Sequence, residues 1–131
     1  MASIFTKIVK GVIPCYKVAE TNKFLAFLDI NPLAKGHTLV IPKKEVDYYF
    51  DLNDNLLKGL TVFSKKVAKA IQKVIPCERI GVTIIGLEVP HAHIHLIPIN
   101  TIHDMEFSKR KLQMSNEEFI KISAKISNAM E

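Results

Sequence analysis

Residues 91–98 read HAHIHLIP, so histidine stands at every second position with apolar residues between. The whole chain has five histidines, and three of them, His91, His93 and His95, fall in this stretch. Successive side chains of a β-strand point to opposite faces, so a strand here places the three imidazoles on one face and the apolar residues in the core. Three explanations compete for such a row: a metal site, a site of proton or phosphate chemistry, and chance placement on a polar strand face.

A single metal ion is difficult to bind with all three rings. At the rise of a strand the outer pair is about 13 Å apart at Cα, whereas zinc–nitrogen bonds are only about 2.0–2.1 Å long. Two of the rings, with a third ligand from elsewhere such as His37, remain an alternative metal site. Chance placement is disfavoured, because a simply polar face would carry Thr, Lys and Ser rather than three imidazoles.

Phosphate chemistry suits a row of imidazoles without a metal. A neutral imidazole is a nucleophile at neutral pH, and it can attack phosphorus to give a phosphoramidate. Neighbouring imidazoles can donate hydrogen bonds to the phosphoryl oxygens, where negative charge accumulates. His93 is the natural nucleophile, because it alone has a partner on both sides.

The composition is that of a globular protein with its own hydrophobic core: 131 residues, 48% hydrophobic and 24% charged. The formal net charge of +5 suits an anionic ligand, but the lysines are spread along the chain, so nucleic acid is not an expected partner. Cys15 and Cys77 form no CxxC pair and are expected to be reduced thiols. The sequence has neither a signal-peptide pattern nor an apolar run of membrane-span length, so we expect a cytoplasmic protein with no membrane partner.

Hydrophobic periodicity predicts an order of helices and strands. The predicted elements are a short helix after Ser3, strands over 15–20, 23–30 and 37–42, a long helix over 54–75, strands over 79–86 and 92–99, and a helix after Ser115. The strand over 79–86 is nearly all apolar and is therefore expected to be central in its sheet. Because strands and helices do not alternate regularly, an antiparallel α+β domain is favoured over a doubly wound one.

The stretch HAHIHLIP also matches the histidine-triad (HIT) motif, His-φ-His-φ-His-φ-φ with φ apolar, at every position. IFTKIVKGVIPCYKVAE (residues 4–20) and FLAFLDINPLAKGHTLVIPKK (residues 24–44) extend the match. Over roughly residues 3–99 the chain resembles the Hint-like, nucleotide-hydrolase branch of the HIT superfamily. The resemblance implies an α+β, HIT-like fold: a five-stranded antiparallel sheet with a long helix and a short N-terminal helix. It also implies one HIT domain over residues 1–131, with an appended C-terminal extension over about 101–131, and a homodimer.

The resemblance further implies hydrolysis or transfer at the α-phosphate of a purine nucleotide through a covalent nucleotidyl-histidine. Carried over by position, His93 is the nucleophile and His95 holds a phosphate oxygen. His91 orients the site, partly through its carbonyl, which accepts a hydrogen bond from the His93 ring. His37 matches a position near the triad that many Hint-like members fill with histidine; a solvent-facing strand-start histidine is the alternative. The transferase branch carries Gln at the third triad position, so His95 favours a hydrolase.

The family places the nucleoside against the N-terminal helix and the end of the second strand. In this chain that implies a set of residues there: Ile4, Phe5, Ile8, Phe27, Asp29 and Ile30. Apolar side chains and Phe rings can sandwich a purine, and the Asp29 carboxylate can accept both ribose hydroxyls. Core packing is the alternative for the apolar members, and capping of the following Asn-Pro turn is the alternative for Asp29.

The loop before the triad departs from the family. Many relatives carry Gln followed by Ser or Thr there, where they assist the leaving group, whereas this chain has Leu87 and Glu88 in a shortened loop. We hypothesise that Glu88 selects a cationic leaving group or donates a proton; a surface carboxylate without a role is the alternative.

Taken together, the sequence predicts a nucleotide hydrolase of the phosphoramidase or dinucleoside-polyphosphate type. The expected partner is a purine nucleotide conjugate with an AMP or GMP moiety, and neither a cofactor nor a metal is expected. Two alternatives stay open. One is a nucleotide-binding regulatory or scaffold protein with incidental hydrolysis, and the other is a zinc-dependent hydrolase that uses the same histidines.

Overall fold

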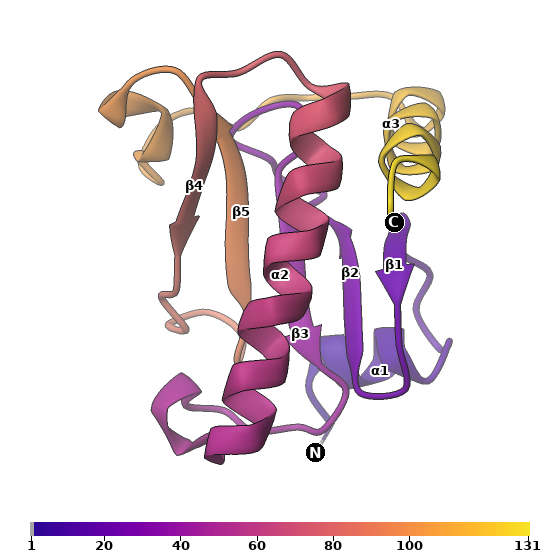
Figure 1. The fold of residues 1–131 in the computed structure, drawn as a ribbon, viewed down its shortest axis with the longest axis vertical. Helices are drawn as coiled ribbons and strands as arrows, with labels where there is room; N and C mark the ends of the chain where they lie inside the picture. Colours follow the sequence, from indigo (N-terminus) through magenta and orange to yellow (C-terminus); the bar gives the residue numbers. More distant parts are fainter. Residues whose placement is uncertain (1) are drawn as a thin grey trace.

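A five-stranded antiparallel sheet organises the chain, in the order β1-β2-β3-β5-β4 (Figure 1). The computed structural model describes residues 2–131, so Met1, where the expected domain begins, lies outside the described residues. The strands are β1 (Lys17–Glu20), β2 (Phe24–Leu28), β3 (Thr38–Pro42), β4 (Arg79–Thr83) and β5 (Ile94–Ile99). The predicted α+β class and five-stranded antiparallel sheet are confirmed.

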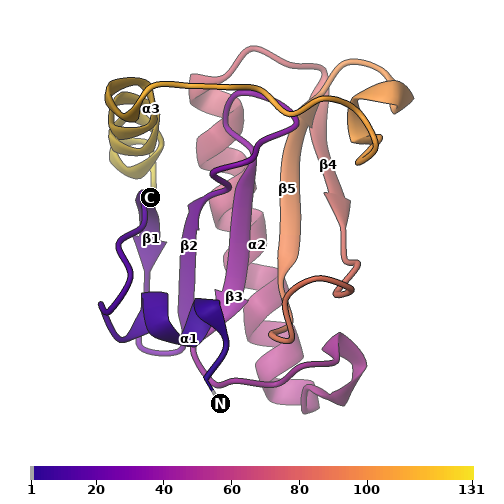
Figure 2. The ribbon, with the colours of Figure 1, turned by 180° about the vertical axis from the view of Figure 1, so that it is seen from behind.

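Helices cover both faces of the sheet. The helices are α1 (Ile4–Val9), α2 (Asp54–Val74) and α3 (Asn116–Asn128), with 3₁₀ turns η1 (Tyr49–Asp51) and η2 (Ile102–Met105). The long helix α2 crosses one face, and α3 lies beside it against β1 (Figure 1). The short helix α1 lies on the opposite face (Figure 2). Within residues 2–131, no helix has the length and apolar character needed to cross a membrane.

Each of the three helices begins at a polar side chain that caps it, and for α1 and α3 this is the residue that the sequence indicates. The Ser3 hydroxyl accepts from the backbone N–H of Thr6 at the start of α1. In the same way Asn53 caps α2, and Ser115 caps α3 by accepting from the Glu118 N–H. A side-chain oxygen at this position satisfies one of the N–H groups that the first helical turn leaves unpaired.

Two hydrophobic clusters form because the sheet is covered on both sides. The larger cluster lies between the sheet, α2 and α3 and includes Ala92, Ile94 and Leu96. The smaller cluster lies under α1 and is formed by Phe5, Leu25, Phe27, Leu39 and Ile41. Both β2 and β3 are buried along their whole length, since alternate side chains enter the two clusters. The strands that support the histidines are thus held from both faces.

The strand within 79–86 is not central, and this prediction is wrong. β4 ends at Thr83 and pairs only with β5, so it is the edge strand of the sheet. Its apolar side chains are not core residues: Val82 is 59% exposed, and Ile84 and Ile85 beyond it are 37% and 45% exposed. An apolar run indicates burial only when an element of the same chain covers it, and nothing in the described chain buries these side chains.

Candidate active site

The three triad histidines lie on the face of the sheet that carries α1. His95 is in β5, and His91 and His93 come just before it. The ring of Phe5, from α1, meets His91 and His93 edge-on, with ring centroids 5.8 and 5.1 Å apart. The His93 and His95 rings are 4.9 Å apart. All three are buried, while the residues between them belong to the cluster under α2. The predicted alternation is therefore confirmed.

A backbone carbonyl fixes the proton of His93. Nδ1 of His93 lies 2.8 Å from the carbonyl oxygen of His91. A carbonyl only accepts, so Nδ1 must carry the hydrogen and donate it. In the neutral ring this leaves the lone pair on Nε2. The middle histidine is thereby held in the tautomer that can act as a nucleophile through Nε2.

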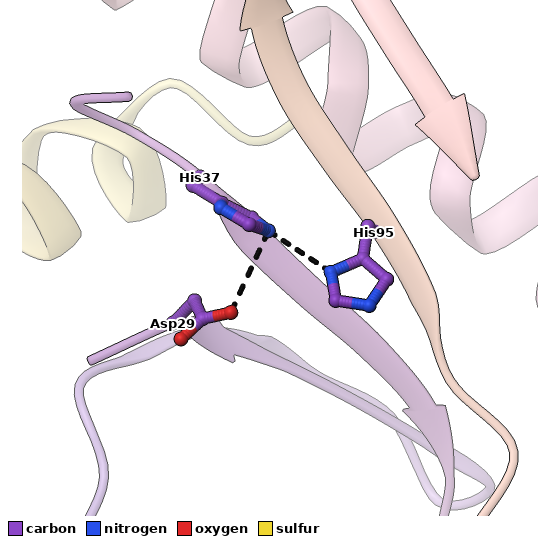
Figure 3. A group of neighbouring side chains, drawn as sticks. All are labelled: Asp29, His37 and His95. Atoms are coloured by element: carbon purple, nitrogen blue, oxygen red, sulfur yellow. Dashed lines mark hydrogen bonds and ion pairs between the residues drawn. The ribbon is translucent and has the colours of Figure 1, made fainter. Parts of the chain in front are cut away.

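A second chain of hydrogen bonds fixes the proton of His95 (Figure 3). The backbone N–H of Leu33 donates to Nδ1 of His37 at 3.0 Å, so His37 carries its proton on Nε2. That Nε2–H points to Nδ1 of His95, also at 3.0 Å. His95 must accept there, and its own proton is therefore on Nε2. His95 therefore presents a neutral N–H donor at Nε2, and the neighbouring ring of His93 carries a lone pair on its own Nε2.

Burial keeps both His37 and His95 neutral. It lowers the pKa of His37 to about 3, with the nearby His95 and Lys111 adding to the effect. It lowers the pKa of His95 to about 4, with His93 as the further cause. Desolvation disfavours a charged imidazole in such surroundings. At neutral pH both rings keep the tautomers that the hydrogen bonds assign.

The first triad histidine is tied to the start of α1. Nε2 of His91 donates to the Pro42 carbonyl at 2.8 Å, which leaves Nδ1 to accept from the Ser3 hydroxyl at 2.8 Å. The Glu45 carboxylate in turn accepts from the Ser3 backbone N–H and from the Thr6 hydroxyl, each at 2.6 Å. These bonds, that of Thr6 first, lower the pKa of Glu45 to about 2. The network joins α1 to the triad, and sequence reasoning missed Glu45 because it lies in an otherwise unremarkable polar loop.

Asp29 faces the buried histidine pair. Its Oδ2 lies 3.6 Å from Nε2 of His37 (Figure 3), and its Oδ1 accepts from the Asn31 N–H at 2.8 Å. Burial raises the pKa of this carboxyl, with the Asn31 hydrogen bond acting in the opposite direction. Asp29 thus makes the turn-capping bond that was the alternative to a ribose contact, while its second oxygen stays on the histidine side.

Asp29, His37 and His95 also form a group whose potential ligand atoms lie within 4.8 Å of one another. The hydrogen bonds do not suit a metal there. Nε2 of His37 carries a proton because Leu33 occupies Nδ1, and metal binding would require that proton to leave. Neutral His37 would then need a proton on Nδ1, opposite the N–H of Leu33. This arrangement suits a hydrogen-bond relay, from Leu33 through His37 to His95, better than it suits a zinc ion.

The predicted nucleoside residues divide into buried and exposed members. Phe5 and Phe27 are buried, with rings 5.4 Å apart, and Ile8 packs against the same cluster. Ile4 and Ile30 are exposed. Core packing does not exclude a place near the triad, because Phe5 contacts the ring of Phe27 in the cluster and also the ring of His93.

Two cavities reach His93 from the side of β4. One, of about 480 Å³, lies between residues 47–50, residues 82–86 and His93. The other, of about 180 Å³, is lined by residues 85–88, His93, His95 and Phe107. Glu88 is exposed at the second one. Sequence reasoning missed Phe107, because it stands in an irregular polar segment with no periodic pattern.

This geometry agrees with the comparison to protein families. The HIT domain model matches residues 10–102, which include all four buried histidines. The chain belongs to the HIT family. The matched region ends before Phe107 and α3.

Individual relatives agree with this membership. An adenosine 5′-monophosphoramidase of Schizosaccharomyces pombe is 46% identical over 100 residues, which are 75% of this chain and 74% of that protein. The crystal structure of a Hit-like protein from Bartonella henselae has a TM-score of 0.85 and 32% identity, covering 98% of this chain and 96% of that one. A zinc-bound histidine triad family protein from Mycobacterium smegmatis has a TM-score of 0.81 and 26% identity, covering 98% and 95%.

Acidification is expected to destabilise the fold through the buried histidines. In the unfolded chain a histidine binds its proton near pH 6.5, whereas His37 does so only near pH 3 and His95 near pH 4 in the native state. The unfolded state therefore holds more protons between these values. As the pH is lowered, the free energy of unfolding falls by about 1.4 kcal/mol per pH unit for each group. Urea unfolding at a series of pH values between about 7 and 4 measures this slope.

Replacing His37→Gln is expected to make that slope shallower, since one of the buried histidines with a lowered pKa is gone. The matched control is His103→Gln, because His103 is exposed and pairs only with Glu106. An unchanged slope in His37→Gln would show that this ring does not titrate with the depressed pKa.

Proposed function

We propose that this protein is a nucleotide hydrolase of the phosphoramidase or dinucleoside-polyphosphate type, with a covalent nucleotidyl-histidine on His93. The observation that carries the proposal is the bond from Nδ1 of His93 to the His91 carbonyl, which leaves Nε2 as a nucleophile. The neutral donor His95 lies beside it, 4.9 Å between ring centroids. The similarity to a relative named an adenosine 5′-monophosphoramidase supports the same activity.

In the first step Nε2 of His93 forms a bond to the α-phosphorus, and the bond from phosphorus to the leaving group breaks. The leaving group departs with the bond's electron pair and is protonated by solvent water. The Nε2–H of His95 donates to a phosphoryl oxygen, where negative charge grows. The His91 carbonyl, which accepts from Nδ1–H, stabilises the positive charge that the His93 ring acquires. Water then attacks phosphorus and releases a proton to solvent, which balances the proton taken up by the leaving group. The P–Nε2 bond breaks, and neutral His93 is restored.

The nucleoside is proposed to bind on the α1 side of the triad. Its purine would lie against the apolar residues of α1 and β2, with an AMP or GMP moiety as the recognised part. The proposed pocket residues are Ile4, Phe5, Ile8, Phe27, Asp29 and Ile30. Oδ2 of Asp29 is the oxygen proposed for the ribose hydroxyls, since Oδ1 is already bonded to Asn31.

A homodimer is proposed through the edge of the sheet at β4. An edge strand presents unpaired N–H and C=O groups on one side. On β4 and next to it the chain exposes a set of large apolar side chains: Tyr48, Phe50, Val82, Ile84, Ile85 and Leu87. An apolar patch of this kind usually marks an interface. Within the dimer each protomer is proposed as one HIT domain with an extension over about 101–131.

His93→Ala is expected to reduce turnover of adenosine 5′-phosphoramidate by at least about 10³-fold, because the attacking nitrogen is lost. Binding of AMP should remain within a fewfold of wild type, measured by calorimetry. His103→Ala, at an exposed histidine, is the control and should keep full turnover. Intact mass after rapid quench should show one added nucleotidyl group on wild type and none on His93→Ala. Retained turnover in His93→Ala would disprove the covalent mechanism.

Glu88→Gln is expected to lower the preference for conjugates with a cationic amine over those with a phosphate leaving group. The change in the ratio of kcat/KM should be about two- to fivefold, the size of an exposed charge interaction. Glu117→Gln, at an exposed glutamate in the first turn of α3, should leave the ratio unchanged. An unchanged ratio in Glu88→Gln would remove the proposed role.

Val82→Lys is expected to shift the protein from dimer to monomer, because it introduces a charge into the exposed apolar surface of β4 itself. Sedimentation velocity at several concentrations measures the change. Ile120→Lys is the control, since Ile120 is also exposed but lies on α3. A wild-type monomer, or equal effects of the two substitutions, would contradict an interface at β4.

A further inference from the structure

The connection from β5 to α3 crosses the sheet on the face that carries the histidines (Figure 2). It is anchored at both ends. Near its start, the Asp104 carboxylate accepts from the backbone N–H groups of Asn100 and Thr101. Near its end, the Leu112 N–H donates to the Pro32 carbonyl at 2.8 Å. A segment fixed in this way can hold a side chain at a defined place over the site.

Phe107 is the side chain that this connection brings to the histidines. Its ring meets His95 edge-on at 4.9 Å between centroids and lies 6.2 Å from the ring of His37. The Lys111 ammonium donates to the Phe107 carbonyl and lies 5.7 Å from the centre of its ring. Phe107 is only partly buried, so part of its ring remains available to a ligand.

The available part of Phe107 lines the cavity of about 180 Å³ beside His93 and His95. The loop of residues 85–88 lines the same cavity and contributes the apolar side chains of Ile85 and Leu87. An apolar cavity of about 150 Å³ is large enough to bind benzene. The space therefore suits one flat ring, with the reactive histidines at its base and an acidic residue, Glu88, among its lining residues.

The position of this cavity indicates which part of a substrate it takes. The proposed nucleoside residues belong to α1 and β2, whereas the cavity is lined by the loop after β4 and the connection after β5. An in-line attack by Nε2 of His93 sends the leaving group away from the attacking ring and apart from the nucleoside. Of the two cavities that reach His93, only this one is also lined by His95, the proposed donor to the phosphoryl oxygen, so we assign it to the leaving group.

We propose that Phe107 is a specificity-determining residue that forms the outer wall of the leaving-group cavity and favours conjugates whose leaving group carries a flat apolar ring. This inference rests on the proposed function. Phe107 lies outside the region matched by the HIT domain model, residues 10–102, so the preference belongs to this chain's C-terminal connection rather than to the triad.

The test compares two amides of AMP that differ only in the leaving amine, benzylamine or methylamine. Phe107→Ala is expected to lower the benzylamide-to-methylamide ratio of kcat/KM by about five- to tenfold, the size of one aromatic contact with its burial. Phe107→Leu should lie between Phe107→Ala and wild type, since it keeps apolar volume without a ring. Ile102→Ala is the control and should leave the ratio unchanged, because Ile102 is exposed on η2 and does not line the cavity.

An unchanged ratio in Phe107→Ala would overturn the proposal. An equal loss with both amides would also overturn it, because the ring would then act only by supporting His95. Dissociation constants of the two amides on His93→Ala, with and without Phe107→Ala, give a second readout. If wild type hydrolyses neither amide, the proposed function fails, and the binding ratio alone decides the role of Phe107.

Discussion

A single backbone hydrogen bond, from the N–H of Leu33 to Nδ1 of His37, determines where the protons of His37 and His95 lie. Because that nitrogen must accept, His37 donates from its other nitrogen, and His95 in turn presents a donor at Nε2. The carbonyl of His91 imposes the opposite tautomer on His93. The backbone thus assigns a donor and a lone pair to two neighbouring rings that are chemically identical in isolation.

This assignment holds only in a dry and rigid setting. Burial keeps the relay rings uncharged, and a charged imidazole would donate from both nitrogens and lose the acceptor that the relay needs. The sheet provides the rigidity, because β3 and β5 pair directly, with Leu39 opposite His95. His37 immediately precedes β3, so strand pairing brings the relay together from two distant parts of the sequence.

The sequence predicted those parts of the molecule that follow from short-range patterns. The alternation in residues 91–98 predicted the shared face of the histidines, and Ser3 and Ser115 predicted two helix starts, because each depends on neighbours within a few residues. The position of β4 was mispredicted, since hydrophobicity alone does not distinguish a buried core from an exposed apolar edge. Glu45 and Phe107 were missed for a different reason. Their contacts with the site come from tertiary placement, and the surrounding residues show no pattern that indicates it.

The two-sided burial of β2 and β3 has a consequence for how such a protein diversifies. A substitution in these strands alters a hydrophobic cluster and also the support of the His37–His95 pair. Evolutionary change there can therefore reduce both stability and activity. The loop of residues 85–88 and the connection that carries Phe107 form no part of either cluster's buried residues. New substrate preferences can therefore arise in these two segments by drift and selection, while the reaction chemistry is inherited unchanged.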